Sequence, residues 1–435
     1  MLYFPSPKTV TGEDVLELHI HGGPATVKAV LSSIPKCPSK LPIRYAEPGE
    51  FTRRAFQNDR LDLAQVEALS DTLSAETEQQ RRAAVRGNSG NLGRTYEGWR
   101  QQLLYARGEL EALIDFSEDQ HFDESPAELL SNVKAHVMLM LESILSHEIA
   151  SHRGELLKKG IRISLLGPPN AGKSSLLNLI VGREASIVSQ EAGTTRDIVE
   201  VSLDIRGYLC TFADTAGLRT KHEQSLGSAP VIGGVEQEGI RRAKAKASES
   251  DVIIALASVE SMGIPGKWFI RYDSEALSIA AKAQQALLAV NKCDSVSSEV
   301  LGQLLIDFKT SSPAPHIPLI AISCMDAQMK SVGVDSGNIN LFVDQLVKTC
   351  ENMTKLPTDL EDLLGVTERQ RQLLSSCSQH LNAFIEEAQV SDGGLESDIV
   401  LAAEHLRSAA NCLSRITGQG EAGDVEEVLG VVFEK

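Results

Sequence analysis

The fold is decided by the stretch Gly167-Pro168-Pro169-Asn170-Ala171-Gly172-Lys173-Ser174, which follows the phosphate-binding pattern G-x-x-x-x-G-K-S/T. The apolar run 161–166 before it predicts a buried strand, and residues 175–181 after it predict a helix. A strand, a loop and a helix in this order aim backbone N–H groups and the positive end of the helix at a phosphate. We therefore expect Lys173 to bind the outer phosphates of a nucleotide and the hydroxyl of Ser174 to bind Mg²⁺.

A second motif identifies the base. The apolar strand predicted at residues 286–290 ends in Asn291-Lys292-Cys293-Asp294, which is the pattern N-K-x-D. The carboxylate of Asp294 can accept hydrogen bonds from the N1–H and the exocyclic amine of guanine. Adenine lacks this pair of donors and would leave a buried carboxylate unpaired, which is costly. The sequence therefore predicts a guanine nucleotide, with Asn291 bridging to the phosphate loop and Lys292 covering the base.

Two switch elements lie between these motifs. Residues 192–197 (AGTTRD) offer a threonine hydroxyl to Mg²⁺, most readily that of Thr195. Residues 214–217 (DTAG) follow an apolar strand and form a D-x-x-G element, whose Asp holds Mg²⁺ through water and whose Gly senses the γ-phosphate. Downstream, Ser323 in residues 320–325 marks the last base-contacting loop, in a degraded form of the usual S-A-K. This order of motifs is that of a GTPase of the translation-factor type.

The residue after Gly217 is Leu218, whereas Ras-like enzymes carry a water-orienting Gln in this region. Leu cannot orient water, so another group must do so. Arg196 and Arg219 are candidate arginine fingers, although a solvated surface role is the more ordinary explanation for each, and a second cation is an alternative source of charge. The expected guanine-nucleotide contacts are Asn170, Ala171, Gly172, Lys173, Ser174, Ser175, Thr194, Thr195, Asp214, Thr215, Ala216, Gly217, Asn291, Lys292, Asp294 and Ser323.

Further stretches outside these motifs are typical of one family. They are residues 11–17 (TGEDVLE), 21–24 (HGGP), 48–56 (PGEFTRRAF), 58–63 (NDRLDL), 114–116 (IDF) and 235–240 (VEQEGI). The run G-E-F-S/T-x-R-A-F beside a phosphate loop is highly specific. Over nearly its whole length the chain resembles the tRNA-modification GTPase family MnmE, also called TrmE, and most of all its animal mitochondrial members.

The resemblance implies how GTP is hydrolysed. In the family K⁺ takes the place of an arginine finger and binds when two G domains meet face to face. The positions that match its ligands are Asn170, Ser189, Glu191 and Thr194. Glu236 matches the acidic residue that orients the water, with Glu223 and Glu238 as rivals because residues 220–234 form a longer segment than the family usually has. An acidic residue in the first turn of a helix is an equally good explanation of Glu236.

The resemblance also implies partners and a product. Family members act as homodimers with an FAD-dependent MnmG-type partner, and they modify C5 of the wobble uridine, position 34, of certain tRNAs. A 5-formyltetrahydrofolate-type one-carbon donor binds the N-terminal domain, where Glu17 and Arg60 match two contact positions. The chain begins within that domain, and it ends at residues 430–435 (GVVFEK) without the family's Cys-x-Gly-Lys, which puts the one-carbon chemistry in question. The expected location is mitochondrial, or cytoplasmic if the source is bacterial.

Composition limits the remaining options. A length of 435 residues corresponds to about two or three domains. The net charge of −17 argues against a protein that coats nucleic acid, so tRNA would need a local basic face. Arg81, Arg82 and Arg86 are candidates for such a face, although an ordinary solvated helix is the better explanation. The seven cysteines show no C-x-x-C spacing, which disfavours zinc, and no apolar stretch predicts a membrane span.

The periodicity predicts a multidomain α/β and all-α fold, with a P-loop GTPase domain inserted into a helical bundle and preceded by a partial α+β folate-binding-type domain. The predicted domains are residues 1–60 (folate binding and dimerisation), 61–157 (first helical part), 158–350 (G domain) and 351–435 (second helical part). Two alternatives to a tRNA-modifying GTPase stay open. They are a ribosome-assembly GTPase, and a truncated GTP-binding scaffold without modification activity.

Overall fold

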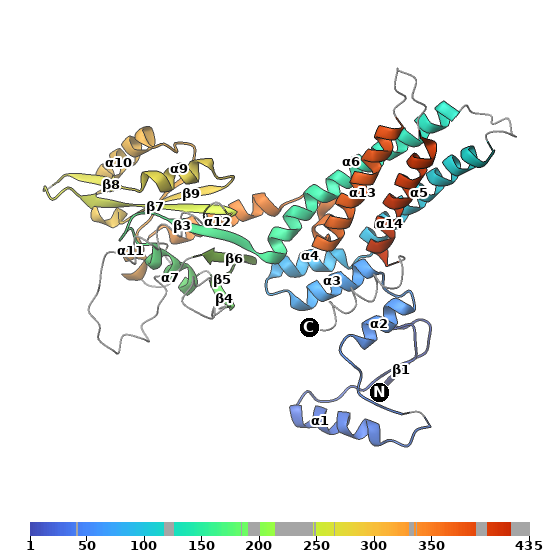
Figure 1. Ribbon diagram of the computed structural model, residues 1–435. Coiled ribbons are helices and arrows are strands. Elements are labelled where there is room, and N and C mark those ends of the chain that lie inside the picture. The colour runs from blue at the N-terminus through green and yellow to red at the C-terminus, as the bar shows by residue number, and fades with distance from the viewer. Residues whose placement is uncertain are drawn as a thin grey trace, which may run out of the picture. The chain divides into compact units, whose positions relative to one another are not determined.

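The computed structural model describes residues 1–40, 42–116, 126–183, 185–189, 201–213, 247, 249–264, 266–329, 335, 337–388 and 398–418. The chain forms two compact units (Figure 1). The helical unit contains residues 1–74, 83–154 and 356–435, and the sheet unit contains residues 75–82 and 155–355. The helical unit is thus interrupted in sequence by the sheet unit, as an α/β domain inserted into a helical bundle requires. The boundaries predicted from the sequence stay predictions.

Within the described part of the sheet unit, eight strands form one mixed sheet in the order β10-β9-β7-β3-β6-β5-β4, with β8 paired to β7. The strands β3, β6, β7, β9 and β10 are parallel neighbours, while β4, β5 and β8 join by antiparallel pairs. Their bounds are β3 Ile161–Leu166, β4 Ala185–Ser189, β5 Val201–Ile205, β6 Tyr208–Ala213, β7 Val252–Ser261, β8 Trp268–Arg271, β9 Ala286–Asn291 and β10 Leu319–Ala321.

Helices cover both faces of this sheet. Figure 1 shows α9 (Ser274–Lys282) and α10 (Ser298–Ser311) on one side and α7 (Lys173–Arg183) and α11 (Cys324–Met329) on the other. The last helix of the unit is α12 (Ile339–Thr354). Parallel strands covered on both faces need continuous apolar sequence, and the first eight residues of β7 are buried without interruption.

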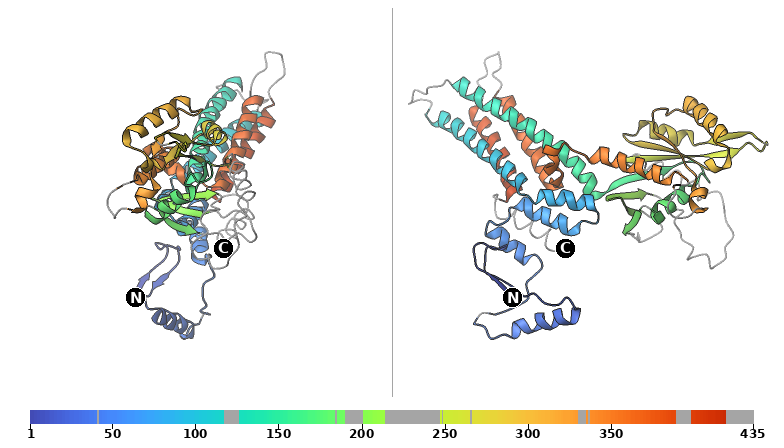
Figure 2. Two further views of the ribbon diagram at one scale, coloured as in Figure 1. Left: turned by 90° about the vertical axis from the view of Figure 1, so that its left-hand side faces the viewer. Right: turned by 180° about the vertical axis from the view of Figure 1, so that it is seen from behind.

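The helical unit is a bundle of α5 (Asn91–Phe116), α6 (Pro126–Lys159), α13 (Glu368–Glu387) and α14 (Ile399–Thr417), which run alongside one another in both views of Figure 2. The shorter elements α3 (Leu63–Ser74), α4 (Glu78–Gly87) and η3 (Thr358–Gly365) complete it. The C-terminal part of α6 and the N-terminal part of α4 belong to the sheet unit. The last helix, α14, carries an apolar stripe at helical spacing that is buried at Ala402, Leu406, Ala409, Leu413 and Ile416.

One buried carboxylate joins parts of the bundle that lie far apart in sequence. Glu67 on α3 accepts hydrogen bonds from Arg369 Nε at 2.5 Å, Gln370 Nε2 at 2.6 Å and Thr367 Oγ1 at 3.2 Å. Thr367 and Gln370 also form the capping box that begins α13. The side chain of Glu67 therefore ties α3 to the first turn of α13.

The described residues of the first sixty are mostly exposed. They form a two-stranded antiparallel sheet of β1 (Leu2–Phe4) and β2 (Val15–Glu17), followed by α1 (Pro24–Ser33), η1 (Ile34–Lys36) and α2 (Glu50–Gln57). Strands and helices are both present, as the sequence predicted. The folate-binding character predicted for this stretch stays a prediction.

Candidate nucleotide site

The phosphate loop follows β3, which lies between β6 and β7 in the sheet. Asn170 has φ 62° and Gly172 has φ 101°, both in the left-handed region that favours Gly and Asn. A Cβ atom on Gly172 would lie 2.1 Å from Nδ2 of Asn291, and one on Gly167 would lie 2.3 Å from the carbonyl oxygen of Leu256. Both glycines of the motif are therefore required by close packing as well as by backbone conformation.

Lys173 begins α7 directly after this loop. Its Nζ donates hydrogen bonds to the carbonyl oxygens of Gly167 and Pro168, each at 2.9 Å. The ammonium group thus curls back over the loop at the N-terminus of the helix, where N–H groups and helix dipole favour an anion. Ser174 and Ser175 occupy the first turn and are half-buried. This arrangement suits the binding of a phosphate chain.

Asn291 connects the loop to the strand that carries the second motif. Its Nδ2 donates to the carbonyl oxygen of Ala171 at 2.8 Å, and its Oδ1 accepts from the backbone N–H of Cys324 at 3.1 Å. The side chain is 3 % exposed. The bridge that the sequence predicted is present, and it extends further than predicted, because it also reaches the segment after β10.

The carboxylate of Asp294 is oriented by Ser323. Ser323 Oγ donates to Asp294 Oδ1 at 2.6 Å and accepts from the backbone N–H of Asp326 at 3.0 Å. Asp294 itself is exposed. One carboxylate oxygen is thus held by protein while the group faces solvent, which suits an acceptor for guanine. The degraded S-A-K element keeps the serine that matters for this contact.

Sequence reasoning missed a charged group beside Lys292. Glu260, near the end of β7, lies 3.4 Å from Lys292 Nζ and 3.3 Å from Arg271 Nη1. No motif marks Glu260, and only the pairing of β7 with β8 and β9 brings it here. Cys293 lies within the base-binding motif and Cys324 directly follows Ser323, and burial raises the pKa of each thiol to about 11. Both are therefore neutral at physiological pH.

Several predicted site residues lie outside the described part of the chain. They are Glu191, Thr194, Thr195, Asp214, Thr215, Ala216, Gly217 and Glu236, together with Arg196, Leu218, Arg219, Glu223 and Glu238. Ser189 ends β4, and only its backbone is described. Of the predicted motifs, those that the structure describes and brings together are the phosphate loop and the base-binding motif, which the hydrogen bond from Asn291 to Ala171 joins.

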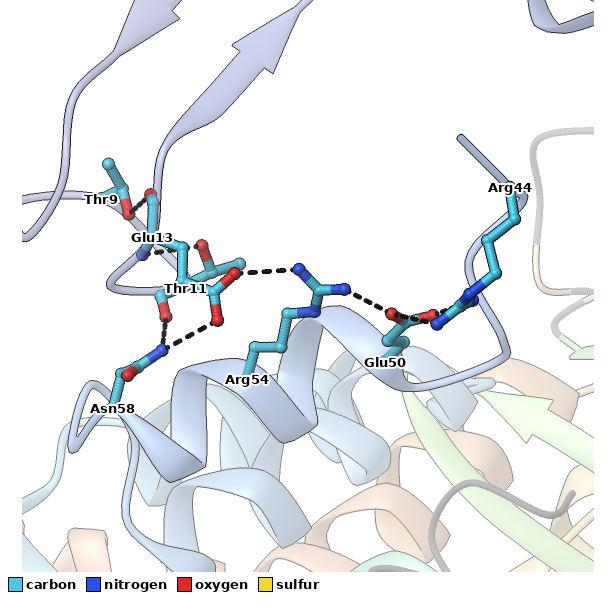
Figure 3. A network of polar contacts seen from close by, with 7 residues as sticks. All are labelled: Thr9, Thr11, Glu13, Arg44, Glu50, Arg54 and Asn58. Atoms are coloured by element: carbon cyan, nitrogen blue, oxygen red, sulfur yellow. Dashed lines mark hydrogen bonds and ion pairs between the residues drawn. The ribbon is translucent and has the colours of Figure 1, made fainter. Parts of the chain in front are cut away.

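The N-terminal stretch contains a separate polar network, drawn in Figure 3. Arg54 donates to Glu13 at 2.9 Å and to Glu50 at 2.6 Å, and Glu50 also accepts both ends of a fork from Arg44 at 2.8 and 2.9 Å. Asn58 Nδ2 donates to the carbonyl oxygen of Thr11 at 2.9 Å. Hydrogen bonds from Arg44, the Glu47 backbone and Arg54 lower the pKa of Glu50 to about 2. This network explains why Glu50 and Arg54 of the G-E-F run occur together.

Glu17 and Arg60, the two predicted folate contacts, are not members of this network (Figure 3). Glu17 is exposed at the end of β2 and accepts a hydrogen bond from His19 Nε2 at 3.0 Å. Arg60 is also exposed, with its Cγ 3.4 Å from the Cβ position of Gly12. Among the described residues 1–40 and 42–116, no hydrogen bond or ion pair joins Glu17 to Arg60.

The candidate basic face on α4 is largely neutralised within the protein. Arg81 and Arg82 both pair with Glu78 at 2.8 Å, and Arg86 pairs with Glu361 at 2.5 Å. These pairs favour an ordinary solvated helix face over a tRNA-binding patch.

Over the ranges that the structure describes, no helix combines the length and the apolar character needed to cross a membrane.

A phosphate loop after a central parallel strand, bridged by Asn291 to an N-K-x-D motif, defines a P-loop GTPase domain. Two family models match the chain. The model described as MnmE helical domain matches residues 63–435, and the one described as GTP-binding protein TrmE N-terminus matches residues 1–60. The chain belongs to the MnmE family of tRNA modification GTPases, which confirms the resemblance noted in the sequence.

Curated relatives agree over the full chain. The tRNA modification GTPase MnmE of Parvibaculum lavamentivorans is 39% identical over 432 residues, covering 99% of this chain and 84% of the relative. The human mitochondrial 5-taurinomethyluridine-tRNA synthase subunit GTPB3 is 36% identical, covering 100% of this chain and 80% of the relative. The mitochondrial tRNA modification GTPase mss1 of Schizosaccharomyces pombe is 36% identical, covering 100% and 82%.

Proposed function

We propose that this chain hydrolyses GTP as part of the modification of C5 of the wobble uridine, position 34, in tRNA. The observation that carries the proposal is the hydrogen bond from Asn291 to the carbonyl oxygen of Ala171, because it joins a phosphate loop to a guanine-binding motif in one site. The relatives above are named tRNA modification GTPases or a tRNA synthase subunit for 5-taurinomethyluridine, which supports tRNA as the substrate.

The described residues fit GTP and Mg²⁺. Lys173 would exchange its two backbone carbonyl partners for phosphate oxygens, and the half-buried Ser174 would supply its hydroxyl to Mg²⁺. Asp294, oriented by Ser323, would accept hydrogen bonds from guanine. Mg²⁺, when bound, neutralises charge that develops on the phosphates. Thr195 and Asp214 are the further magnesium-site residues that we propose.

K⁺ is proposed as the cation that completes the site when two G domains meet. Asn170 has a left-handed backbone and is exposed in the phosphate loop, which supports a role as a K⁺ ligand. Ser189, Glu191 and Thr194 are proposed to complete the ion's shell, and Glu236 to orient the attacking water, since Leu218 cannot. GTPase rates at several protein concentrations in KCl and in NaCl test both ideas. Equal rates in the two salts would contradict the K⁺ role, and Asn170→Ala should reduce the difference.

The proposed partners are a second copy of the chain, an FAD-dependent MnmG-type protein and tRNA. Glu17 and Arg60 are proposed contacts of a 5-formyltetrahydrofolate-type donor. Glu17 and Arg60 are both exposed and have different neighbours, so their positions indicate no step of one-carbon transfer. The relatives from animals and yeasts are named mitochondrial, which supports a mitochondrial location, or a cytoplasmic one if the source is bacterial.

The test is mass spectrometry of tRNA from cells that lack this protein. We expect loss of the C5 modification at position 34, restored by the wild-type chain and not by Asp294→Asn. Unchanged modification together with altered ribosomal subunit ratios would instead support a ribosome-assembly GTPase. Restoration by Asp294→Asn would support a scaffold role that needs no nucleotide.

A further inference from the structure

The end of β7 carries a carboxylate that is built into the edge of the nucleotide site. β7 pairs with β9 as far as Ser258, which lies opposite Asn291, and then continues with β8, where Glu260 lies opposite Phe269. Side chains two residues apart on a strand share a face. Ser258, which is 0 % exposed, donates from Oγ to Glu260 Oε1 at 3.1 Å. The carboxylate is therefore anchored from its own strand.

Two cations complete the surroundings of this carboxylate. Lys292 Nζ lies 3.4 Å from Oε1, and Arg271 Nη1 of β8 lies 3.3 Å from Oε2. Partial burial tends to raise the pKa of Glu260, but the hydrogen bonds from Ser258 and Arg271 and the charge of Lys292 outweigh it, so the pKa is lowered. The group is ionised at neutral pH and attracts Lys292.

Lys292 is fixed at both ends by these contacts. Its backbone is left-handed, with φ 63°, and follows Asn291, whose side chain is bonded to the phosphate loop and to the Cys324 backbone. Its ammonium group is held by Glu260. The aliphatic stem of Lys292 therefore extends from the backbone beside Asn291 to Glu260 at the end of β7. Lys292 lies two residues before Asp294 in the sequence.

We infer that Glu260 is a positioning residue of the guanine site, which holds the stem of Lys292 in place to cover the face of the base. This inference rests on the proposed guanine-nucleotide site. A lysine side chain has much rotamer freedom to lose, and a partner that orders it before the ligand arrives lowers the cost of binding. Because the stem covers the ring face, Glu260 affects how tightly any purine in the site is held, and Asp294 alone discriminates between base edges.

The experiment uses the full chain and fluorescent guanosine diphosphate. Glu260→Gln keeps the shape of the side chain and removes its charge, and Glu299→Gln on α10 is the matched control at an exposed acidic residue. For a partly exposed ion pair we expect Glu260→Gln to raise the dissociation constant by about twofold to fivefold. The increase should arise from faster dissociation of the nucleotide. Glu299→Gln should bind as the wild type does.

Two further measurements separate positioning from a general structural role. Inosine diphosphate lacks the exocyclic amine that Asp294 would bind, but it has the same ring face for Lys292 to cover. Glu260→Gln should therefore lower the affinity for inosine diphosphate by the same factor as the affinity for guanosine diphosphate. In a Lys292→Met background, which keeps an apolar stem without the charge, Glu260→Gln should have no effect. The inference is overturned if Glu260→Gln binds like the wild type, or if its effect persists beside Lys292→Met. Failure of the wild-type chain to bind any guanine nucleotide would instead overturn the proposed function, and this inference with it.

Discussion

The bridge made by Asn291 should be the most sensitive point of the nucleotide site. Asn291→Ala removes the donor to the carbonyl oxygen of Ala171 and the acceptor for the N–H of Cys324. Ala171 is 0 % exposed and Cys324 is 6 % exposed, so water cannot readily replace the lost partners. Each buried polar group left unpaired costs about 1–3 kcal/mol, so the loss of both partners should lower the free energy of unfolding of the sheet unit by about 2–6 kcal/mol.

The two tryptophans allow this loss to be assigned to one unit. Trp268 lies on β8 in the sheet unit, and Trp99 lies on α5 in the helical unit. Urea unfolding of a Trp99→Phe protein, followed by the fluorescence of Trp268, would report the sheet unit alone. Since the bridge also fixes the phosphate loop, the dissociation constant for guanosine diphosphate should rise more than about tenfold.

Matched variants define what would refute this reasoning. Gly172→Ala would place a Cβ 2.1 Å from Asn291 Nδ2, so it should displace the same amide and reproduce both effects. Asn411→Ala removes an exposed asparagine on α14 and should change neither quantity. Ordinary surface substitutions change the free energy of unfolding by roughly 0.5 kcal/mol or less. If Asn291→Ala changed it by no more than this, the hydrogen bonds of Asn291 would not contribute to the stability of the sheet unit.

Three predictions concern the helical unit, with Trp99 fluorescence as the measurement of its unfolding. Glu67→Ala removes the acceptor for the buried amide of Gln370 and for Nε of the partly exposed Arg369, and it should lower the free energy of unfolding by about 1–3 kcal/mol; a loss below about 0.5 kcal/mol would contradict a stabilising role of Glu67. Burial lowers the pKa of His147 to about 4, so the unfolded chain takes up the proton first and stability should fall as pH drops from about 6.5 towards 4, by up to ~3 kcal/mol. His147→Gln should flatten this dependence, and a profile unchanged by that substitution would rule out His147 as its source. Gly154→Ala would place a Cβ 2.4 Å from the carbonyl oxygen of Leu364 and should destabilise by about 1–3 kcal/mol. The same change at Gly98, which has open space around it, should stabilise α5 by about 0.5–1 kcal/mol, and equal effects at the two glycines would refute the packing argument.

Much of the nucleotide site was predictable because its motifs are local. A loop between a strand and a helix is built by consecutive residues, and Gly172 satisfies a backbone requirement that is visible in the sequence. Asp294 follows its strand in the same local way. The stripe on the last helix was predictable for a related reason, since the spacing of Ala402, Leu406 and Ala409 records which face is buried.

Other contacts had no local signal. Leu73 continues the helical spacing of α3 and yet is 81% exposed, because periodicity alone does not show where the packed surface ends. The hairpin that carries Arg271 follows no motif, and Glu260 is one of many glutamates until β7 and β9 are aligned. The same holds for Arg81 and Arg82, whose basic appearance in the sequence conceals their pairs with Glu78.

The sequence by itself determined that this protein binds a guanine nucleotide and belongs to a tRNA-modifying family, because phosphate and base recognition depend on residues that are neighbours in the chain. Only the tertiary structure decided how these pieces are joined. Asn291 meets Ala171 across 120 residues, and Glu67 meets Gln370 across 303. Such partners are chosen by strand register and helix packing, which are properties of the whole fold. For that reason Glu260 acquires a proposed role at the nucleotide site only once the strands are in place.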